Sequence, residues 1–209
     1  MYKTILIGLG RIASLNNQDQ AMLKSVKYAS HAQVLSDHEK YNWIAGVDPS
    51  LEACDYVKKT WRIEEITNSI NSIKDPDIFE IAVLAVPPES RLECIKHFPS
   101  LKGVIVEKPL GVSYAASEEF IKECNKRGII VQTNLTRRSD IVMKKLASGD
   151  LKNKIGNIQF AFGSYGRGLR NYGIHLIDLV RMLIGEIVTV RSISSNEDFD
   201  AGPLKGDNN

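Results

Sequence analysis

MYKTILIGLGRIA, residues 1–13, is the stretch of sequence that decides the fold of this chain. Tyr2–Ile7 is a short apolar run typical of a buried strand, and a G-x-G-x-x-A turn follows it directly. Gly8 allows a tight turn, Gly10 lets backbone N–H groups approach a pyrophosphate closely, and Ala13 is small enough to pack on the strand. The pattern predicts a dinucleotide-binding fold. We expect four residues of the turn to contact the dinucleotide: Gly8, Gly10, Arg11 and Ile12.

The composition is ordinary for a globular protein of one domain or one and a half. The chain has 209 residues, 43% of them hydrophobic and 25% charged. The net charge of +2, with scattered Lys and Arg, does not favour nucleic acid or an anionic membrane as a partner. No apolar run approaches the ~18 residues that span a bilayer, and the first residues do not form a signal peptide. We therefore expect a cytoplasmic protein.

Neither the cysteines nor the histidines suggest a metal site. Cys54, Cys94 and Cys124 lie far apart in helix-like segments, and there is no C-x-x-C motif. The four histidines lack zinc-type spacing, so we expect no metal. We interpret the cysteines as buried reduced thiols, with a catalytic cysteine as the alternative.

Strand and helix patterns alternate along the first two thirds of the chain. This order predicts an α/β fold with a doubly wound parallel sheet. The expected strands are Tyr2–Ile7, Trp43–Val47, Ile78–Val86, Gly103–Val106 and Ile129–Thr133. The expected helices are Ala21–His38 (in part), Leu51–Thr60, Glu89–Phe98 and Ser113–Arg127, while Glu64–Ile73 is ambiguous.

The character of the sequence changes near residues 134–137. We therefore expect a dinucleotide-binding domain over 1–134 and a second α/β domain over 135–209. The second part has helical patterns and only two predicted strands, Ile158–Phe162 and Ile187–Ile193. A two-stranded sheet is rarely stable alone, so this domain is expected to be incomplete.

Four blocks of sequence resemble the glucose–fructose oxidoreductase, inositol dehydrogenase and rhizopine catabolism (Gfo/Idh/MocA) family. They are Gly8–Ala13, Val86-Pro87-Pro88, Glu107-Lys108-Pro109-Leu110 and Asn171–Asp178. The resemblance implies an N-terminal Rossmann domain and a C-terminal α/β domain with an open sheet. It also implies a homo-oligomer in the full-length form. Because full-length members are longer, we expect this chain to be shortened at its C-terminus.

Asp48 follows the second predicted strand and is the candidate ligand of an adenosine ribose. Its carboxylate would repel a 2′-phosphate, which favours NAD over NADP as the cofactor. The distance from Ala13 exceeds the usual ~20 residues, which indicates an insertion around residues 14–33. The alternative is that Asp48 is only the N-cap of the next helix.

The other candidates of the first domain also follow predicted strands. We expect Pro87 beside the nicotinamide ribose and Glu107 at the cofactor. The resemblance implies that Lys108 reaches the substrate hydroxyl and that its bond to proline is often cis. It also brings Asn134 or Arg137 near the cofactor or the substrate. The alternative for Lys108 is a solvated lysine paired with Glu107, and for Arg137 a solvated basic pair with its neighbour.

Asn171, His175 and Asp178 are spaced i, i+4 and i+7, so they share one face of a predicted helix. His175 has a side chain suited to accept the proton of a substrate hydroxyl. Many family members carry Asp where this chain has Asn171, which is able to orient a partner but not to take a proton. The alternative is that Asn171 is a helix N-cap and His175 a satisfied, half-buried residue.

These observations predict a nicotinamide-dependent oxidoreductase that transfers hydride at a carbinol carbon. The expected substrate is a small carbohydrate: a sugar, a sugar nucleotide or a polyol. The predicted catalytic residues are Lys108, His175 and Asn171. Two alternatives remain. One is a non-catalytic NAD(H)-binding protein or an inactive fragment of such an enzyme. The other is a fragment of poor solubility with an apolar patch exposed on the two predicted strands of the second domain.

Overall fold

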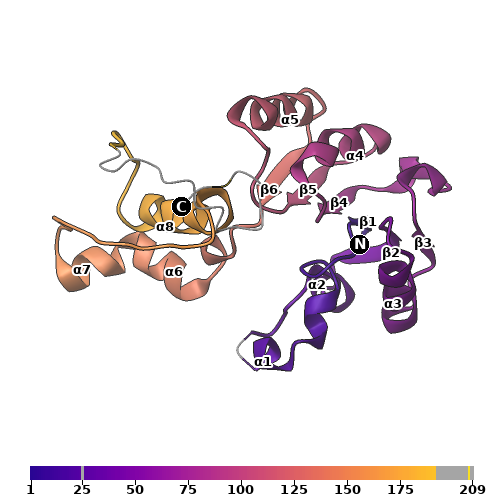
Figure 1. Cartoon of the computed structure of the whole chain (residues 1–209), viewed down its shortest axis with the longest axis horizontal. Helices are drawn as coiled ribbons and strands as arrows, with labels where there is room; N and C mark the ends of the chain where they lie inside the picture. Colours follow the sequence, from indigo (N-terminus) through magenta and orange to yellow (C-terminus); the bar gives the residue numbers. More distant parts are fainter. Residues whose placement is uncertain (25, 192–206, 208–209) are drawn as a thin grey trace. The chain divides into compact units, whose positions relative to one another are not determined.

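The computed structural model describes residues 1–24, 26–191 and 207, which fall into two compact units, Met1–Asn134 and Leu135–Asn209. The first unit is built on a six-stranded sheet in the order β3-β2-β1-β4-β5-β6 (Figure 1). Every neighbouring pair of strands is parallel. The strands are β1 (Tyr2–Ile7), β2 (Tyr41–Val47), β3 (Glu65–Thr67), β4 (Ile81–Leu84), β5 (Gly103–Val106) and β6 (Ile130–Thr133). This is the doubly wound Rossmann arrangement that the sequence predicts.

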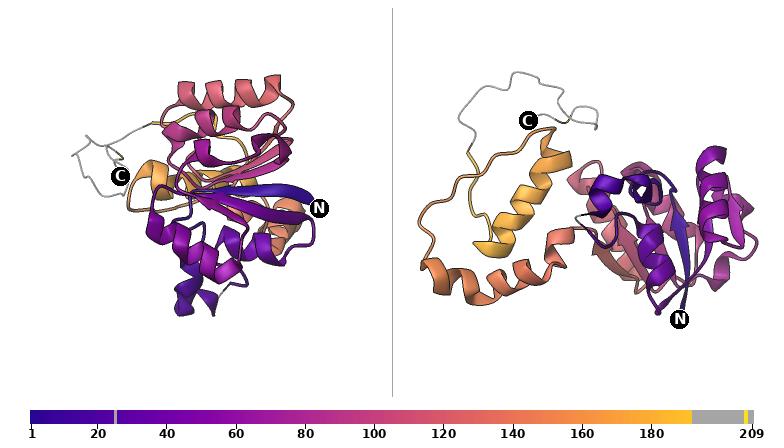
Figure 2. Two further views of the ribbon diagram at one scale, coloured as in Figure 1. Left: turned by 90° about the vertical axis from the view of Figure 1, so that its right-hand side faces the viewer. Right: turned by 90° about the horizontal axis from the view of Figure 1, so that it is seen from below.

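Helices cover both faces of this sheet, as a parallel sheet requires. The left view of Figure 2 shows α4 (Arg91–His97) and α5 (Tyr114–Lys126) on one face, with α2 (His31–Asp37) and α3 (Leu51–Trp61) on the other. Each face has its own apolar cluster. The sheet is therefore buried between two layers of helices.

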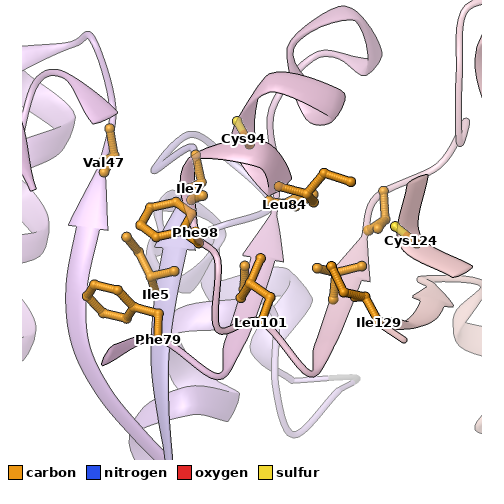
Figure 3. Close-up of a cluster of buried hydrophobic side chains, with 14 of the residues drawn as sticks. Ile5, Ile7, Val47, Phe79, Leu84, Cys94, Phe98, Leu101, Cys124 and Ile129 are labelled. Carbon is orange, nitrogen blue, oxygen red and sulfur yellow. The ribbon is translucent and has the colours of Figure 1, made fainter. Parts of the chain in front are cut away.

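The larger cluster joins the face of α4 and α5 to the central strands (Figure 3). Phe79 and Phe98 are fully buried, and their rings meet edge to face with centroids 5.5 Å apart. Ile5 of β1 belongs to the same cluster. Cys94 and Cys124 lie in it as buried free thiols, and burial raises the pKa of each to about 11. The cysteines are thus buried and unpaired, as predicted.

The stretch Ala21–His38, expected to be helical in part, contains two separate helices. The structure has a 3-10 turn at Leu15–Gln18, a short α1 at Gln20–Leu23 and then α2. Two separate N-caps explain the break. Asp19 accepts hydrogen bonds at the start of α1, and Ser30 accepts one from the Gln33 N–H at the start of α2.

Smaller differences concern the ends of elements. The ambiguous stretch Glu64–Ile73 contains β3 and a 3-10 turn at Ile70–Ser72. The strand predicted over Ile78–Val86 is limited to β4, because a 3-10 turn at Pro76–Ile78 precedes it. A further 3-10 turn, Pro88–Ser90, precedes α4.

The second unit contains helices and no strand among its described residues. Its elements are a 3-10 turn at Thr136–Arg138, α6 (Ile141–Lys145), a π-type turn at Leu146–Asp150, α7 (Leu151–Ile155), a second π-type turn at Leu169–Gly173 and α8 (Ile174–Leu183). None of the helices described in either unit is long and apolar enough to cross a membrane.

Both strands predicted in the second unit are wrong as far as the structure describes them. Residues 158–162 and 187–191 are not in strands, and residues 192–193 lie outside the described part. A strand forms only when another strand accepts its backbone hydrogen bonds, and neither segment pairs with a described strand. Their apolar side chains are correspondingly exposed, with Phe162 at 86% and Val188 at 96%.

Candidate functional site

The register of the sheet brings the ends of its strands to one edge. Ile7 is level with Val47 on one side and Leu84 on the other, and Leu84 is level with Val106. The residues that follow these strands therefore meet at the carboxyl edge, where open α/β sheets bind ligands. The residues that follow β1, β2, β5 and β6 directly are Gly8, Asp48, Glu107 and Asn134.

The fold of the chain requires a glycine at position 8, whether or not a ligand is bound. Its φ angle is +85°, and an added Cβ would lie 2.5 Å from the carbonyl oxygen of Ala85. Its N–H donates to the Val47 carbonyl at 2.8 Å. Gly8 therefore allows the chain to leave β1 between β2 and β4, at the point where the strand order reverses.

At Gly10, no described neighbour would clash with a larger side chain. A Cβ added there would meet no described atom within 4 Å. The backbone N–H groups of Gly10, Arg11 and Ile12 donate to no acceptor among the described residues. Ala13 is 1% exposed and packs in the smaller apolar cluster. The turn therefore has an open face lined with N–H donors, which fits the pyrophosphate of a dinucleotide.

Asp48 holds the turn and the start of α3 together. One carboxylate oxygen accepts from the Leu9 N–H at 2.6 Å, and the other accepts from the Ser50 N–H at 2.8 Å. Ser50, not Asp48, is the N-cap of α3, because its side chain accepts from the Ala53 N–H. The N-cap alternative for Asp48 is therefore wrong. An open cavity of about 350 Å³ lies nearby, with Cys54 and Thr67 in its lining.

Glu107 is the centre of a polar cluster that the sequence did not reveal. Its Oε1 contacts His31 Nε2 at 2.8 Å and accepts from Asn134 Nδ2 at 2.6 Å. The Glu107 side chain is 12% exposed. Burial opposes its ionisation, but the hydrogen bonds from His31 and Asn134 and the charges of His31 and Lys108 outweigh it, so the pKa of Glu107 lies below its ordinary value. Glu107 is thus held as a carboxylate beside the turn.

His31 connects this cluster to the turn itself. It is the first residue of α2, and its backbone N–H donates to the Ile12 carbonyl at 3.1 Å. A sequence signal for its position existed, because Ser30 and Gln33 have the spacing of a capping box. Ser30 accepts from the Gln33 N–H, whereas the Gln33 side chain accepts from the Ala29 N–H, one residue before the cap. The contact with Glu107 itself joins residues far apart in the sequence and has no local signal.

Lys108 and Pro87 lie on loops at the same edge. The Lys108–Pro109 peptide bond is cis. Lys108 is half-buried, and Pro87 is exposed where the chain leaves β4. Arg91 links the two loops, because its guanidinium donates to the carbonyls of Val86, Pro109 and Leu110. Sequence analysis missed Arg91 as well, since an arginine at the start of a helix normally faces solvent.

Asn171 and His175 belong to the second unit. Asn171 is buried, and its Nδ2 donates to the Arg167 carbonyl at 3.1 Å. Its own backbone N–H and that of Arg170 donate to the carboxylate of Asp207. Asn171 therefore lies inside the helical turn. The alternative that Asn171 is a helix N-cap is wrong. His175 is half-buried and meets the ring of Tyr172 edge to face at 6.5 Å.

Asp178, the third residue of the predicted polar row, is held by an arginine. Arg138 Nε donates to Asp178 Oδ1 at 2.6 Å, and Asp178 is 6% exposed. This pair joins the start of the second unit to α8. Arg137 and Arg138 are both exposed, as the alternative of a solvated basic pair expects, and Arg138 in addition pairs with Asp178.

A model of the Gfo/Idh/MocA group, described as an oxidoreductase family with an NAD-binding Rossmann fold, matches residues 3–135. Among curated proteins, trans-1,2-dihydrobenzene-1,2-diol dehydrogenase of Oryctolagus cuniculus is 25% identical over 129 residues, which are 54% of this chain and 39% of that protein. The same enzyme of Bos taurus is 23% identical over 129 residues, 54% of this chain and 38% of that protein. The chain thus spans about two fifths of the length of these relatives.

Solved structures show the same fold. Scyllo-inositol dehydrogenase of Lactobacillus casei with bound NAD(H) and scyllo-inositol matches with a TM-score of 0.68 and 20% identity, covering 88% of this chain and 56% of that one. An oxidoreductase of Agrobacterium radiobacter in complex with NAD+, L-tartaric acid and magnesium matches with a TM-score of 0.69 and 17% identity, covering 95% and 60%. At these identities the likeness concerns the fold alone.

Proposed function

The chain belongs to the Gfo/Idh/MocA oxidoreductase family, whose fold is an NAD-binding Rossmann fold, and we propose that it binds NAD(H) and acts on a sugar or polyol. The observation that carries the proposal is the turn around Gly10. Its N–H donors have no acceptor in the described part of the chain, and no described neighbour requires the glycine. A dinucleotide pyrophosphate explains both features.

The proposed preference is for NAD over NADP. Asp48 directly follows β2, where the ribose of the adenosine half would lie in a Rossmann fold. Its two oxygens are fixed by the N–H groups of Leu9 and Ser50, so its negative charge has a defined position. A carboxylate so placed accepts ribose hydroxyls and repels a 2′-phosphate.

For the reaction, we propose hydride transfer at a carbinol carbon, with NAD(H) as the redox partner when bound. Lys108 would hold and polarise the substrate oxygen, and His175 would exchange the proton of that hydroxyl. Asn171 would orient the hydroxyl or His175. The names of the similar proteins, which include inositol and dihydrodiol dehydrogenases, support substrates with ring hydroxyl groups.

The test is a titration of the purified chain with NADH and with NADPH, followed by nicotinamide fluorescence. We expect saturable NADH binding and weaker NADPH binding. Asp48→Ala should weaken NADH binding about tenfold, as expected for the loss of a hydrogen bond to a charged group. Asp48→Asn keeps an acceptor but removes the charge, so it should mainly narrow the difference between the two cofactors.

Asp77→Ala is the matched control, because Asp77 is exposed and lies in the 3-10 turn before β4. It should bind NADH like the original chain. Absence of binding to either cofactor, in a folded sample, would refute the proposal. NADH binding without turnover of any polyol or sugar would favour the alternative of a non-catalytic binding protein.

A further inference from the structure

Arg91 is a buried charge that forms no ion pair with any described residue. It is 2% exposed and the largest of the fully buried side chains among the described residues. None of the ion pairs found in the described part of the chain includes it. Burial lowers the pKa of its guanidinium to about 10, and the charges of Glu107 and Glu89 oppose this effect. Arg91 therefore remains charged at neutral pH.

All the hydrogen bonds found for the guanidinium among the described residues go to backbone carbonyls. Nε and Nη2 donate to the Val86 carbonyl at 3.2 and 3.1 Å. Nη1 donates to the Leu110 carbonyl at 3.0 Å and also to the Pro109 carbonyl. Val86 lies on the loop after β4, and Pro109 and Leu110 lie on the loop after β5. One side chain thus fixes two loops at the carboxyl edge.

Packing does not account for an arginine at this position. An apolar side chain at the start of α4 would fill the space without the cost of desolvating a charge. A planar guanidinium with several donors in fixed directions is suited to hold separate carbonyls in one arrangement. The residue immediately before the anchored Pro109 carbonyl is Lys108. The position of the Lys108 backbone therefore depends on Arg91.

We propose that Arg91 is a positioning residue, which fixes the loop of Lys108 against the Val86–Pro88 loop and thereby sets where the Lys108 amine lies. This role for the reaction rests on the proposed function. The placement of Lys108 by Arg91 is a property of the folded chain and does not require a bound cofactor.

Arg127 provides a matched control within the same unit. It also bridges backbone carbonyls, those of Ile95, Phe98 and Pro99, but at the amino edge, before β5 begins. Removing it deletes the same kind of interaction on the side of the sheet away from Lys108. Any effect that comes only from lost stability should therefore be common to both arginines.

The experiment follows the dimethylated lysine amines of the full chain by NMR after reductive methylation with labelled formaldehyde. The Lys108 resonance is assigned by its absence in Lys108→Arg. In the cofactor-free chain, we expect Arg91→Lys and Arg91→Met to shift or broaden the Lys108 resonance, while Arg127→Met leaves it unchanged. Arg91→Ala should recover the original resonance when millimolar guanidinium is added. NADH binding should weaken about tenfold in Arg91→Met.

An unchanged Lys108 resonance in folded Arg91→Lys and Arg91→Met would overturn the proposal. So would an equal change in Arg127→Met, or loss of the fold in both Arg91 variants while Arg127→Met stays folded, since Arg91 would then be a general structural residue. Because the NMR measurement needs no cofactor, failure of NADH binding in the original chain would refute the proposed function without deciding this inference.

Discussion

The two units of the chain differ in whether their apolar, strand-like segments pair with another strand and become buried. In the first unit every predicted strand has a parallel neighbour, and Ile5, Leu6 and Leu84 are fully buried. In the second unit the segments 158–162 and 187–191 have equally strand-like sequences, but they are not in strands. Phe160 and Val190 are each 85% exposed.

The helices of the second unit form nevertheless. A helix satisfies its backbone hydrogen bonds within its own segment, whereas a strand depends on a second segment. A strand-like sequence pattern therefore shows only that a segment is able to pair. The segment forms a strand only where a second strand lies beside it. This difference explains why helices form in both units, whereas the strand-like segments form strands only in the first.

The largest expected effect comes from a matched pair of phenylalanines, one in each unit. Phe98→Ala removes a fully buried ring that packs on Phe79, so it should lower the free energy of unfolding by ~3–5 kcal/mol. Phe162→Ala removes a ring that is 86% exposed and should change it by less than ~0.5 kcal/mol. Urea titrations measure both, followed by tryptophan fluorescence for the first unit, which contains Trp43 and Trp61, and by helical circular dichroism for the second. Comparable losses would mean that Phe162 is buried in solution and would break the comparison.

The next largest effect is the contribution of the buried Glu107 carboxylate to the free energy of unfolding, which depends on pH. The pKa of Glu107 is lowered from 4.5, so the folded state binds fewer protons at this site than the unfolded state as the pH falls. The stabilisation is complete above pH ~5.5 and is lost as the pH falls through the lowered folded pKa. Glu107→Gln should therefore cost ~1–2 kcal/mol at neutral pH, the difference between hydrogen bonds to a charged and a neutral acceptor. The cost should vanish at the acid end.

The control for this effect lies in the second unit. Glu186 pairs with Arg181, and both are exposed. Glu186→Gln should leave the pH dependence of unfolding unchanged, because exposed pairs contribute little. Denaturant titrations across the acid range compare the two variants. If Glu107→Gln lost stability in acid as the original chain does, Glu107 would not be the group responsible for that loss.

The smallest effect compares two helix caps. Ser50 caps α3 in the first unit, and Asp140 caps α6 in the second by accepting from the Met143 N–H. Ser50→Ala should lower the unfolding free energy of the first unit by ~1 kcal/mol. Asp140→Ala should leave that transition where it is and reduce only the helical circular dichroism. Equal shifts of the transition by both variants would show that the units unfold as one.

Much of the first unit was readable from the sequence, because its signals are local. The strand Gly103–Val106 was predicted where the structure has it, and the helix predicted over Ser113–Arg127 matches α5 with its flanking residues Ser113 and Arg127. The stretch Ala21–His38 was expected to be helical only in part, but the break between its two helices and the second cap, Ser30, were not predicted. The Rossmann turn was recognised because glycines at fixed spacing have a direct geometric meaning.

The candidate site was only partly predictable. Residues that follow strands, such as Asp48 and Glu107, can be found by locating strand ends. Their partners cannot be found in this way: His31 reaches Glu107 across 76 positions, and Arg91 reaches Pro109 across 18. Such contacts depend on how the helices pack on the sheet, and no local sequence pattern specifies this packing. The roles of Lys108, Asn171 and His175 remain predictions.

The position of β1 in the sheet has a consequence for how the chain is made. β1 is a central strand, and it leaves the ribosome well before its neighbours β2 and β4, from which many residues separate it. At ~5–20 residues per second, β1 waits several seconds before β4 is available. During synthesis its fully apolar segment Ile5–Ile7 is therefore a target for chaperones, and ribosome-bound chains ending before Ile81 should bind them more strongly than chains that include β4.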